Sequence, residues 1–432
     1  MPTSPPLEVR SFPGPETIHR SILDNGVVLL ARENFSSPSV VLTGYLEAGA
    51  LDESPEQGGL ADLTASALMR GTHSRTFTQI YESIESIGAS LSLGSGTHFL
   101  SFRGRALAED LELLLSLLAD VLQHPVFPRE QVERLVAEKI TGLGLRDQDT
   151  ASVAQMAFDE LAYPDHPYRL PSDGTRESVA RLMPADLQAF HRRKIGPTGC
   201  VIAVVGAVPS AAAAEVVARH LGDWRNPSQE HQPALPELVP LQGTVRRDVP
   251  LAGKSQCDIL LGCPGPSRFD PAYIAASLGN NILGSIGMMG RIGDVVREQA
   301  GLAYYASSSL GGGPGPGAWE VGAGVAPPNV DRVIELISRE IRRFVTKPVT
   351  PQELRDSQTN YIGRLPLQLE TNDGVAGALL NIERYDLSLD FYQRYPDIVR
   401  AIRRDDLLAA ARRFLDPERL AIGVSGTFGS RE

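Results

Sequence analysis

The segment GGLADLTASALMRGT, residues 58–72, has the features of a helix that carries catalytic side chains. Two glycines precede it, small and apolar residues form its body, and Gly-Thr ends it. Residues four apart on such a helix share one face and can hold a metal ion together. The positions where we would expect metal ligands and a general base hold Asp62, Ala65 and Ser66. Only Asp62 can bind a metal well, because serine is a poor zinc ligand and alanine moves no proton.

No other part of the sequence offers a replacement metal site. Three cysteines without C-x-x-C spacing give neither a disulfide framework nor a zinc knuckle, and we expect buried thiols in a reducing compartment. Six of the eight histidines are considered as substitutes, and they are scattered without one-turn spacing: His73, His98, His124, His166, His191 and His220.

Composition and charge limit the classes of function. The 432 residues, 42% apolar and 22% charged, predict a globular chain of two domains. A net charge of -11 argues against nucleic acid or an anionic membrane surface as the main partner. The most apolar segment, residues 200–224, is interrupted by Pro209 and carries Glu215 and Arg219, so we expect no membrane span. The N-terminal segment MPTSPPLEVRSFPGPETIHR contains five prolines and no apolar core, so we expect no secretory signal and a cytoplasmic protein.

The second half of the sequence repeats a pattern of the first. LLSLLADVLQHPVFPREQVERLVAEKI and VIELISREIRRFVTKPVTPQELRDSQTNYI both contain a helix, a Pro-Val-x-Pro turn and another helix. Pro125 and Pro128 match Pro348 and Pro351 with the same offset, since 348 − 125 and 351 − 128 are equal. A single repeat of this size predicts two homologous domains.

A linker separates the two predicted domains. Residues 225–243 are rich in proline, polar and without period, which leaves domains 1–224 and 244–432. In the first domain, a helix is expected over residues 57–70 and a two-stranded hairpin over 89–106.

The order and spacing of several segments resemble the pitrilysin/insulinase-like metallopeptidases, in particular the branch with two-domain subunits such as mitochondrial processing peptidase. The segments include GGLADL, MRGT, HPVFPREQVER, HPYRLPSDGTRES, GCVIAVVGAV and GRIGDVVREQAGLAYYASS, and together they span nearly the whole chain. The resemblance implies an α+β fold with two homologous domains, each a mostly antiparallel sheet packed with helices. Two such chains would enclose a chamber for unfolded peptides.

Active members of this family carry H-x-x-E-H on a helix, in which two histidines bind zinc and the glutamate is the general base. The matched positions here are Asp62, Ala65 and Ser66, and the position of a distant glutamate ligand falls near Glu138. A lone glutamate there is also typical of a solvated helix. The resemblance therefore implies that this chain binds no cofactor and that zinc belongs to a partner subunit.

Arg297 and Tyr304, in VVREQAGLAYYASS, are separated by about two helical turns of sequence. By the resemblance, this pair would face the zinc and donate hydrogen bonds to the substrate carbonyl and to charge developing on the tetrahedral intermediate. The pattern alone favours a helix end, a glycine turn and a strand, with the arginine solvated and the tyrosine at a sheet rim; only with the resemblance is the functional interpretation favoured.

Gly284, Gly287 and Gly290 resemble a short form of the glycine-rich loop in the non-catalytic processing-peptidase subunit. They are candidate contacts for an incoming extended peptide. Glycines at this spacing also permit close helix packing, and they lack the lysine and the G-x-G-x-x-G pattern of nucleotide-binding loops.

Three hypotheses about function remain. The favoured one is a zinc-less subunit of a heterodimeric metallopeptidase for unfolded peptides, in which an H-x-x-E-H partner supplies zinc and base, and this chain supplies Arg297 and Tyr304. The substrate would add as a strand to a sheet edge, and a homodimer could form without the partner. The second is a structural or assembly protein, in which both residues are dispensable. The third is a hydrolase with another metal site, which requires stoichiometric metal in the isolated chain.

Overall fold

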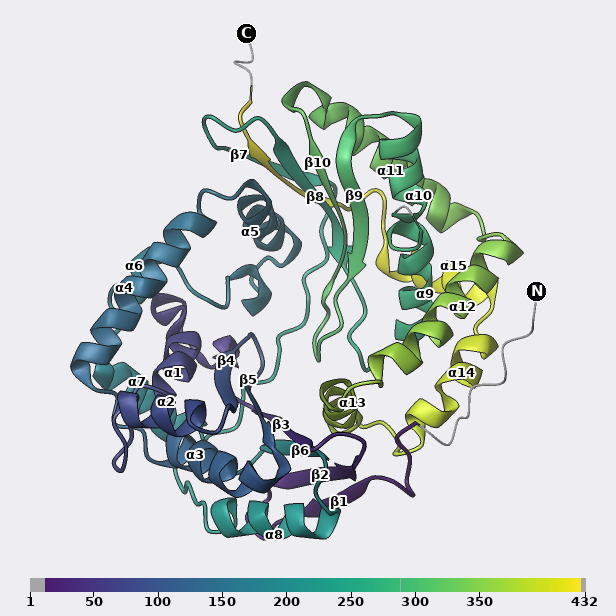
Figure 1. Cartoon of the computed structure of the whole chain (residues 1–432). Helices are drawn as coiled ribbons and strands as arrows, with labels where there is room; N and C mark the ends of the chain where they lie inside the picture. The colour runs from purple at the N-terminus through teal and green to yellow at the C-terminus, as the bar shows by residue number, and fades with distance from the viewer. Residues whose placement is uncertain (1–11, 288, 429–432) are drawn as a thin grey trace. The chain divides into compact units, whose positions relative to one another are not determined.

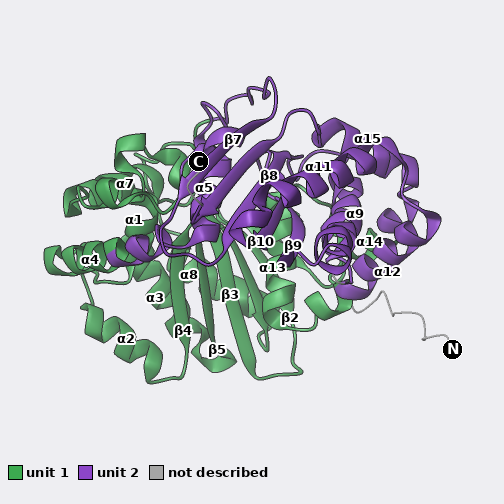
Figure 2. Cartoon of the chain, turned by 90° about the horizontal axis from the view of Figure 1, so that it is seen from above, with its two compact units in different colours: residues 1–140, 172–233, 365–396 green, residues 141–171, 234–364, 397–432 purple. Residues whose placement is uncertain are grey.

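The computed structural model describes residues 12–287 and 289–428, and the chain divides into two compact units (Figure 2). Unit 1 combines residues 1–140, 172–233 and 365–396, and unit 2 combines residues 141–171, 234–364 and 397–432. Each unit therefore takes one segment from the other half of the sequence. The domain boundaries 1–224 and 244–432 follow the sequence repeat, and this division of the chain stays a prediction. The segment considered for a secretory signal begins in residues 1–11, which lie outside the described residues.

Unit 1 is built on a six-stranded sheet in the order β1-β2-β6-β3-β5-β4 (Figure 1). In this sheet β2 and β6 pair in parallel, and the other neighbours are antiparallel. The predicted hairpin over 89–106 is β4 and β5. The strands are β1 (His19–Ile22), β2 (Val28–Glu33), β3 (Ser39–Leu46), β4 (Ser90–Ser95), β5 (Leu100–Leu107) and β6 (Val201–Gly206).

The main core of unit 1 lies between one face of this sheet and helices from the first half of the sequence. It combines alternate strand residues such as Leu29 and Leu42 with buried residues of α1, α3, α7 and α8. The predicted helix over 57–70 is α1. The helices are α1 (Leu60–Leu68), α2 (Phe77–Glu85), α3 (Leu111–Gln123), α4 (Arg129–Arg146), α6 (Arg176–Val179), α7 (Pro184–Lys194) and α8 (Ser210–Leu221).

Unit 2 is built on a five-stranded sheet in the order β7-β11-β8-β10-β9, antiparallel except for β7 and β11. Its strands are β7 (Val245–Pro250), β8 (Cys257–Pro264), β9 (Ala303–Leu310), β10 (Ala318–Val325) and β11 (Ala421–Gly426). The helices of the second half are α9 (Tyr273–Gly284), α10 (Gly290–Gly293), η6 (Asp294–Gln299), α11 (Val330–Thr346), α12 (Pro351–Gln368), α13 (Asn372–Arg384), α14 (Phe391–Ala401) and α15 (Arg404–Phe414).

Each sheet is also packed against a helix from the other half of the sequence. In unit 1, α13 contacts β3 and β6; in unit 2, α5 (Thr150–Ala162) contacts β7, β8 and β11. The contact of α5 with β11 is close, because a Cβ on Gly423 would lie 2.2 Å from the carbonyl oxygen of Ala154. The helices α5 and α13 begin at Thr150 and Asn372, and this separation nearly equals the offset of the sequence repeat. The exchanged helices are therefore equivalent parts of the repeat.

The predicted linker, residues 225–243, contains no helix or strand, and its first part is bound to unit 1. The side-chain amide of Gln229 donates to the carbonyl oxygen of Thr198 (2.8 Å) and accepts from its backbone N–H (3.1 Å). Lys194 Nζ donates to the carbonyl oxygen of His231 at 3.0 Å. None of the helices in the described residues has the length and apolar character needed to cross a membrane.

Candidate functional site

The start of α1 is fixed by close packing of two sequence motifs. Gly59 has a φ of +90°, and a Cβ there would lie 2.8 Å from the carbonyl oxygen of Asp173. Ser178 Oγ donates to the carbonyl oxygen of Gly58 at 2.7 Å. Glycine alone accepts both the left-handed backbone and the lack of space. The two glycines before α1 thus serve its packing against the SDGTRES segment.

Glu53 caps α1, and the sequence patterns did not single it out. Its carboxylate accepts hydrogen bonds from the backbone N–H groups of Gly59 (2.8 Å) and Ala61 (2.5 Å). Burial raises the pKa of Glu53 to about 8, although the two backbone hydrogen bonds act in the opposite direction. An acidic residue shortly before the two glycines at the helix start is the signal that could have found it.

A partly exposed face of α1 and the turn after it are joined to α4 by two ion pairs, one with its acidic residue on α1 and one with its acidic residue on α4. Asp62 and Ser66, one turn apart, are both partly exposed, and Arg70 follows one turn later. Asp62 Oδ2 lies 2.6 Å from Lys139 Nζ, and Arg70 lies 3.5 Å from a carboxylate oxygen of Glu138. Of the three predicted motif positions, Asp62 therefore takes part in the contact between α1 and α4.

These residues do not fit a zinc ion. The ammonium group of Lys139 already neutralises Asp62 and would repel a divalent cation. Ala65 is fully buried in the core, so this position offers no base. Glu138, the predicted position of a distant ligand, also pairs with Arg134 of its own helix at 2.9 Å. Among the described residues, no three or more His, Cys, Asp or Glu side chains are grouped as metal ligands.

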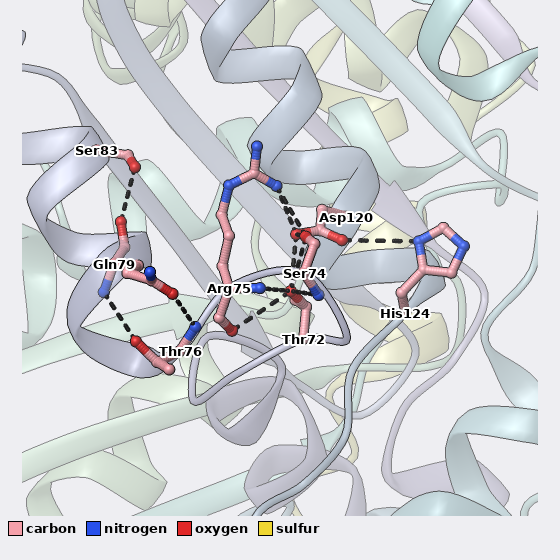
Figure 3. A network of polar contacts seen from close by, with 8 residues as sticks. All are labelled: Thr72, Ser74, Arg75, Thr76, Gln79, Ser83, Asp120 and His124. Atoms are coloured by element: carbon pink, nitrogen blue, oxygen red, sulfur yellow. Dashed lines mark hydrogen bonds and ion pairs between the residues drawn. The ribbon is translucent and has the colours of Figure 1, made fainter.

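The loop after α1 is held by a polar network around Asp120 of α3 (Figure 3). One carboxylate oxygen of Asp120 accepts from Thr72 Oγ1 (2.8 Å), Ser74 Oγ (2.6 Å) and Arg75 (2.6 Å). Burial acts to raise the pKa of Asp120, but these hydrogen bonds and the arginine outweigh it and lower the pKa. The loop borders a pocket of about 410 Å³. The Gly-Thr exit of the motif therefore anchors α1 to α2 and α3.

Arg297 lies in a π-helical turn of unit 2. The turn is η6, and it packs against β9. The Arg297 side chain is 36% exposed, and its Nε lies 3.6 Å from a carboxylate oxygen of Glu298, a weak surface ion pair. Single π-helical turns recur at functional sites, where they displace a side chain from the regular helical position.

Tyr304 occupies a β-bulge at the start of β9. Tyr305 lies opposite Gly324 and Ala303 lies opposite Val325, so Tyr304 is the extra residue in the described pairing with β10. Its side chain is 85% exposed. Bulges redirect side chains and are frequent beside active sites. Both residues of the predicted pair thus come from irregular backbone on two neighbouring elements.

The three predicted loop glycines have different surroundings. A Cβ on Gly284 would lie 2.2 Å from the backbone nitrogen of Ser308, and one on Gly290 would lie 2.6 Å from the carbonyl oxygen of Ile282. Gly287 has a φ of +62° and open space around it. Close packing therefore accounts for Gly284 and Gly290. Peptide contact by this segment stays a prediction; residue 288 within it lies outside the described part of the chain.

The sheet edges differ in how they are protected. An unprotected edge is a ready site for strand addition, and charges or proline on an edge oppose it. The edge strand β7 carries Arg246, Arg247 and Pro250, and β1 carries Arg20. The edge strand β4 has the uncharged sequence SLSLGS and packs against α1. In unit 1, α1 thus lies beside an uncharged sheet edge.

Comparison with known proteins identifies the family. A model of the insulinase-type peptidase family M16 matches residues 28–168, and a model described as the peptidase M16 inactive domain matches residues 181–361. The chain belongs to peptidase family M16. This confirms the resemblance deduced from the sequence motifs, and the sequence of this M16 chain contains no H-x-x-E-H.

Relatives of this M16 chain include proteins of two kinds. An uncharacterized zinc protease of Streptomyces coelicolor is 25% identical over 96% of this chain and 91% of its own length. The mitochondrial cytochrome b-c1 complex subunit 1 of mouse is 28% identical over 62% of this chain and 56% of its own length.

A solved structure confirms the fold. The crystal structure of a peptidase M16 inactive domain from Pseudomonas fluorescens has a TM-score of 0.88 and 23% identity, over 96% of this chain and 99% of that one. The predicted α+β fold with two homologous, mostly antiparallel domains is therefore correct.

Proposed function

We propose that this M16 chain is the zinc-less subunit of a heterodimeric metallopeptidase that acts on unfolded peptides. The partner is an M16 chain with H-x-x-E-H, and a homodimer forms in its absence. The observation that carries the proposal is the contrast between two regions. The motif face of α1 is neutralised by the Asp62–Lys139 ion pair, whereas Tyr304 is displaced by a bulge and 85% exposed.

In this proposal, Arg297 and Tyr304 act on the carbonyl group of the substrate. The guanidinium and the phenol each donate a hydrogen bond to the carbonyl oxygen and to the negative charge that develops on it. Fixed donors of this kind lower the barrier because they need no reorganisation during the reaction. The partner's zinc supplies the activated water, and the partner's glutamate moves its proton.

The peptide is proposed to bind in extended form. Strand addition to β4 would use the backbone groups of the outer edge of this strand and impose little side-chain specificity. This suits a subunit that handles unfolded chains of varied sequence. The cytoplasmic location stays an expectation from the sequence.

Replacement of Arg297, one of the two proposed donors, tests this proposal. In the assembled pair, Arg297→Ala is expected to lower peptide cleavage by about 100-fold, as loss of one oxyanion donor does elsewhere. Assembly, measured by size-exclusion chromatography, should not change. Arg332→Ala is the matched control, since Arg332 is an exposed arginine of unit 2 paired locally with Glu335 in its own helix. Full activity of Arg297→Ala would refute the proposal.

A second candidate function is a structural or assembly role on the same fold. The 28% identity to a subunit of the cytochrome b-c1 complex supports it. It predicts that Arg297→Ala and Tyr304→Phe both leave the assembly of the chain and the activity of its complex unchanged. A hydrolase with another metal site would instead require stoichiometric metal in the isolated chain.

A further inference from the structure

Adjacent tyrosines on β9 have opposite environments. Tyr304 is 85% exposed, whereas the hydroxyl of Tyr305 donates a hydrogen bond to Asp258 Oδ1 at 2.5 Å. Burial, together with this carboxylate, raises the pKa of Tyr305. Tyr305 is therefore a neutral donor to this carboxylate at physiological pH.

The ring of Tyr305 reaches Asp258 by crossing the intervening strand. Tyr305 on β9 and Asp258 on β8 both lie opposite Gly324 of β10, so the three residues form one row across three strands. A Cβ on Gly324 would lie 2.5 Å from a ring carbon of Tyr305. Glycine at this position is therefore a condition for the contact.

Asp258 is a buried junction of three elements. It is 2% exposed, and its second carboxylate oxygen accepts from Thr150 Oγ1, the first residue of α5, at 2.5 Å. Gln256 Nε2 donates to Asp258 Oδ1 at 3.1 Å, the oxygen that also accepts from Tyr305. Three donors offset the cost of burying a carboxylate. Because Asp258 lies on β8 and accepts hydrogen bonds from Thr150 of α5 and Tyr305 of β9, it holds the start of β9 in one position.

The outer edge of β9 is held as well. The backbone N–H of Ala306 points to the sulfur of Met289 at 3.4 Å, and Ser285 Oγ donates to the carbonyl oxygen of Ser308 at 3.1 Å. From Tyr305 onward, β9 is thus bound on both sides. Tyr304 lies next to this fixed segment, so the direction of its side chain depends on where Tyr305 is held.

We propose that Asp258 is a positioning residue for Tyr304. Through the hydroxyl of Tyr305 it fixes the β-bulge, and the bulge directs the phenol of Tyr304 toward the substrate. The consequence for catalysis rests on the proposed function, in which Tyr304 contacts the substrate carbonyl. The fixed position of the start of β9 is independent of the proposed function.

The activity test is a double-mutant cycle in the assembled pair, with an extended fluorogenic peptide as substrate. Tyr305→Phe is expected to lower kcat by about 10-fold with KM changed less than twofold, since a misplaced donor weakens the transition state more than the bound peptide. In the Tyr304→Phe background, Tyr305→Phe should cause no further loss, because its whole effect passes through the Tyr304 hydroxyl. Additive losses, or an unchanged kcat in Tyr305→Phe beside an impaired Tyr304→Phe, would overturn the positioning role.

A structural readout separates this inference from the proposed function. Hydrogen exchange of the amides in residues 303–306 should be at least tenfold faster in Tyr305→Phe and in Gly324→Ala than in the unmodified chain. Tyr361→Phe is the matched control, because it removes a tyrosine hydroxyl of α12 that donates to the carbonyl oxygen of Ser277 in α9 at 3.1 Å and makes no hydrogen bond to β9 in the described structure. Unchanged exchange in Tyr305→Phe refutes the anchor, whatever the activities are. If exchange rises but Tyr304→Phe has full activity, the proposed function fails and the anchor stands.

Discussion

The ammonium nitrogen of Lys139 lies 2.6 Å from a carboxylate oxygen of Asp62, the residue predicted to stand at the first position of the family's zinc motif. Both side chains are mostly buried, with 26% and 21% of their surfaces exposed. A fixed cation thus occupies the immediate surroundings of Asp62, the one motif position whose side chain could bind a metal well. The loss of the motif is accompanied by a structural contact between α1 and α4.

Restoring the motif should not by itself restore zinc binding. The triple variant Asp62→His, Ala65→Glu, Ser66→His keeps the ammonium of Lys139 beside the first ligand, where it repels the metal. Adding Lys139→Met, which keeps the length of the side chain without its charge, should raise zinc affinity by at least about 10-fold. Titration with zinc in competition with a chromogenic chelator measures both affinities. Equal zinc affinities with and without Lys139→Met would show that the ammonium group of Lys139 does not oppose zinc binding at this position.

Glu53 should contribute to the stability of unit 1 through α1. Glu53→Ala leaves the backbone N–H groups of Gly59 and Ala61 without their acceptor, which is expected to cost about 1–3 kcal/mol of unfolding free energy. Urea denaturation followed by circular dichroism measures this cost. Glu56→Ala is the control, because Glu56 is exposed and lies in the same segment. A loss no greater than that of the control would contradict the capping role.

A pair of partly buried carboxylates links α5 to the sheet of unit 2. Gln155 Nε2 donates to Asp159 at 3.1 Å and to Glu320 of β10 at 3.3 Å, and Ser309 donates to Glu320 at 3.2 Å. Burial, with the neighbouring Glu320, raises the pKa of Asp159 to about 7, and burial also raises the pKa of Glu320.

The stability of unit 2 should therefore fall as pH rises toward neutrality. The raised pKa means that the folded state holds the proton of Asp159 more tightly than the unfolded state, so stability is lost between about pH 4 and pH 7. Asp159→Asn cannot ionise and should be more stable than the unmodified chain by about 2–4 kcal/mol at pH 8, with little difference at pH 4. Thermal unfolding at both pH values measures the difference. A difference that is the same at pH 4 and pH 8 would be inconsistent with this assignment.

Substitutions of Gly284, the last residue of α9, and of Gly287 in the following turn should distinguish a role in packing from a role in peptide binding. Gly284→Ala forces a Cβ against the backbone nitrogen of Ser308, so we expect several kcal/mol of destabilisation or failure to fold. Gly287→Ala meets open space and should cost only about 1 kcal/mol, because of its positive φ. Urea denaturation of both variants measures these costs. Equal costs would mean that the local backbone differs from the one described. A loss of peptide cleavage in a stable Gly287→Ala would support the predicted peptide contact.

The repeat offset and the motif order were readable from the sequence because they depend on local periodicity and turn residues. The hairpin of β4 and β5 and the helix α1 follow from the same signals. The exchange of α5 and α13 between the units was not predictable, because apolar residues on a helix do not specify which sheet they cover. The Asp62–Lys139 pair joins two helices that are far apart in the sequence, and no local pattern records such a contact.

The bulge at Tyr304 could not be predicted from the sequence either. AYYASSSL is a regular strand pattern, and the extra residue appears only in the register with β10. Asp258, Gly324 and Tyr305 likewise come together only through strand pairing. Sequence analysis identified Arg297 and Tyr304 through a family resemblance, and the irregular backbone around them is an independent observation.

The most direct test is to purify this chain from its own cells and to measure, by mass spectrometry, what accompanies it in equal amount. We predict a second M16 chain that carries H-x-x-E-H, in a complex that cleaves unfolded peptides. A homodimer, or a stoichiometric complex without such a chain, would contradict the composite active site and leave the structural role as the function of this protein.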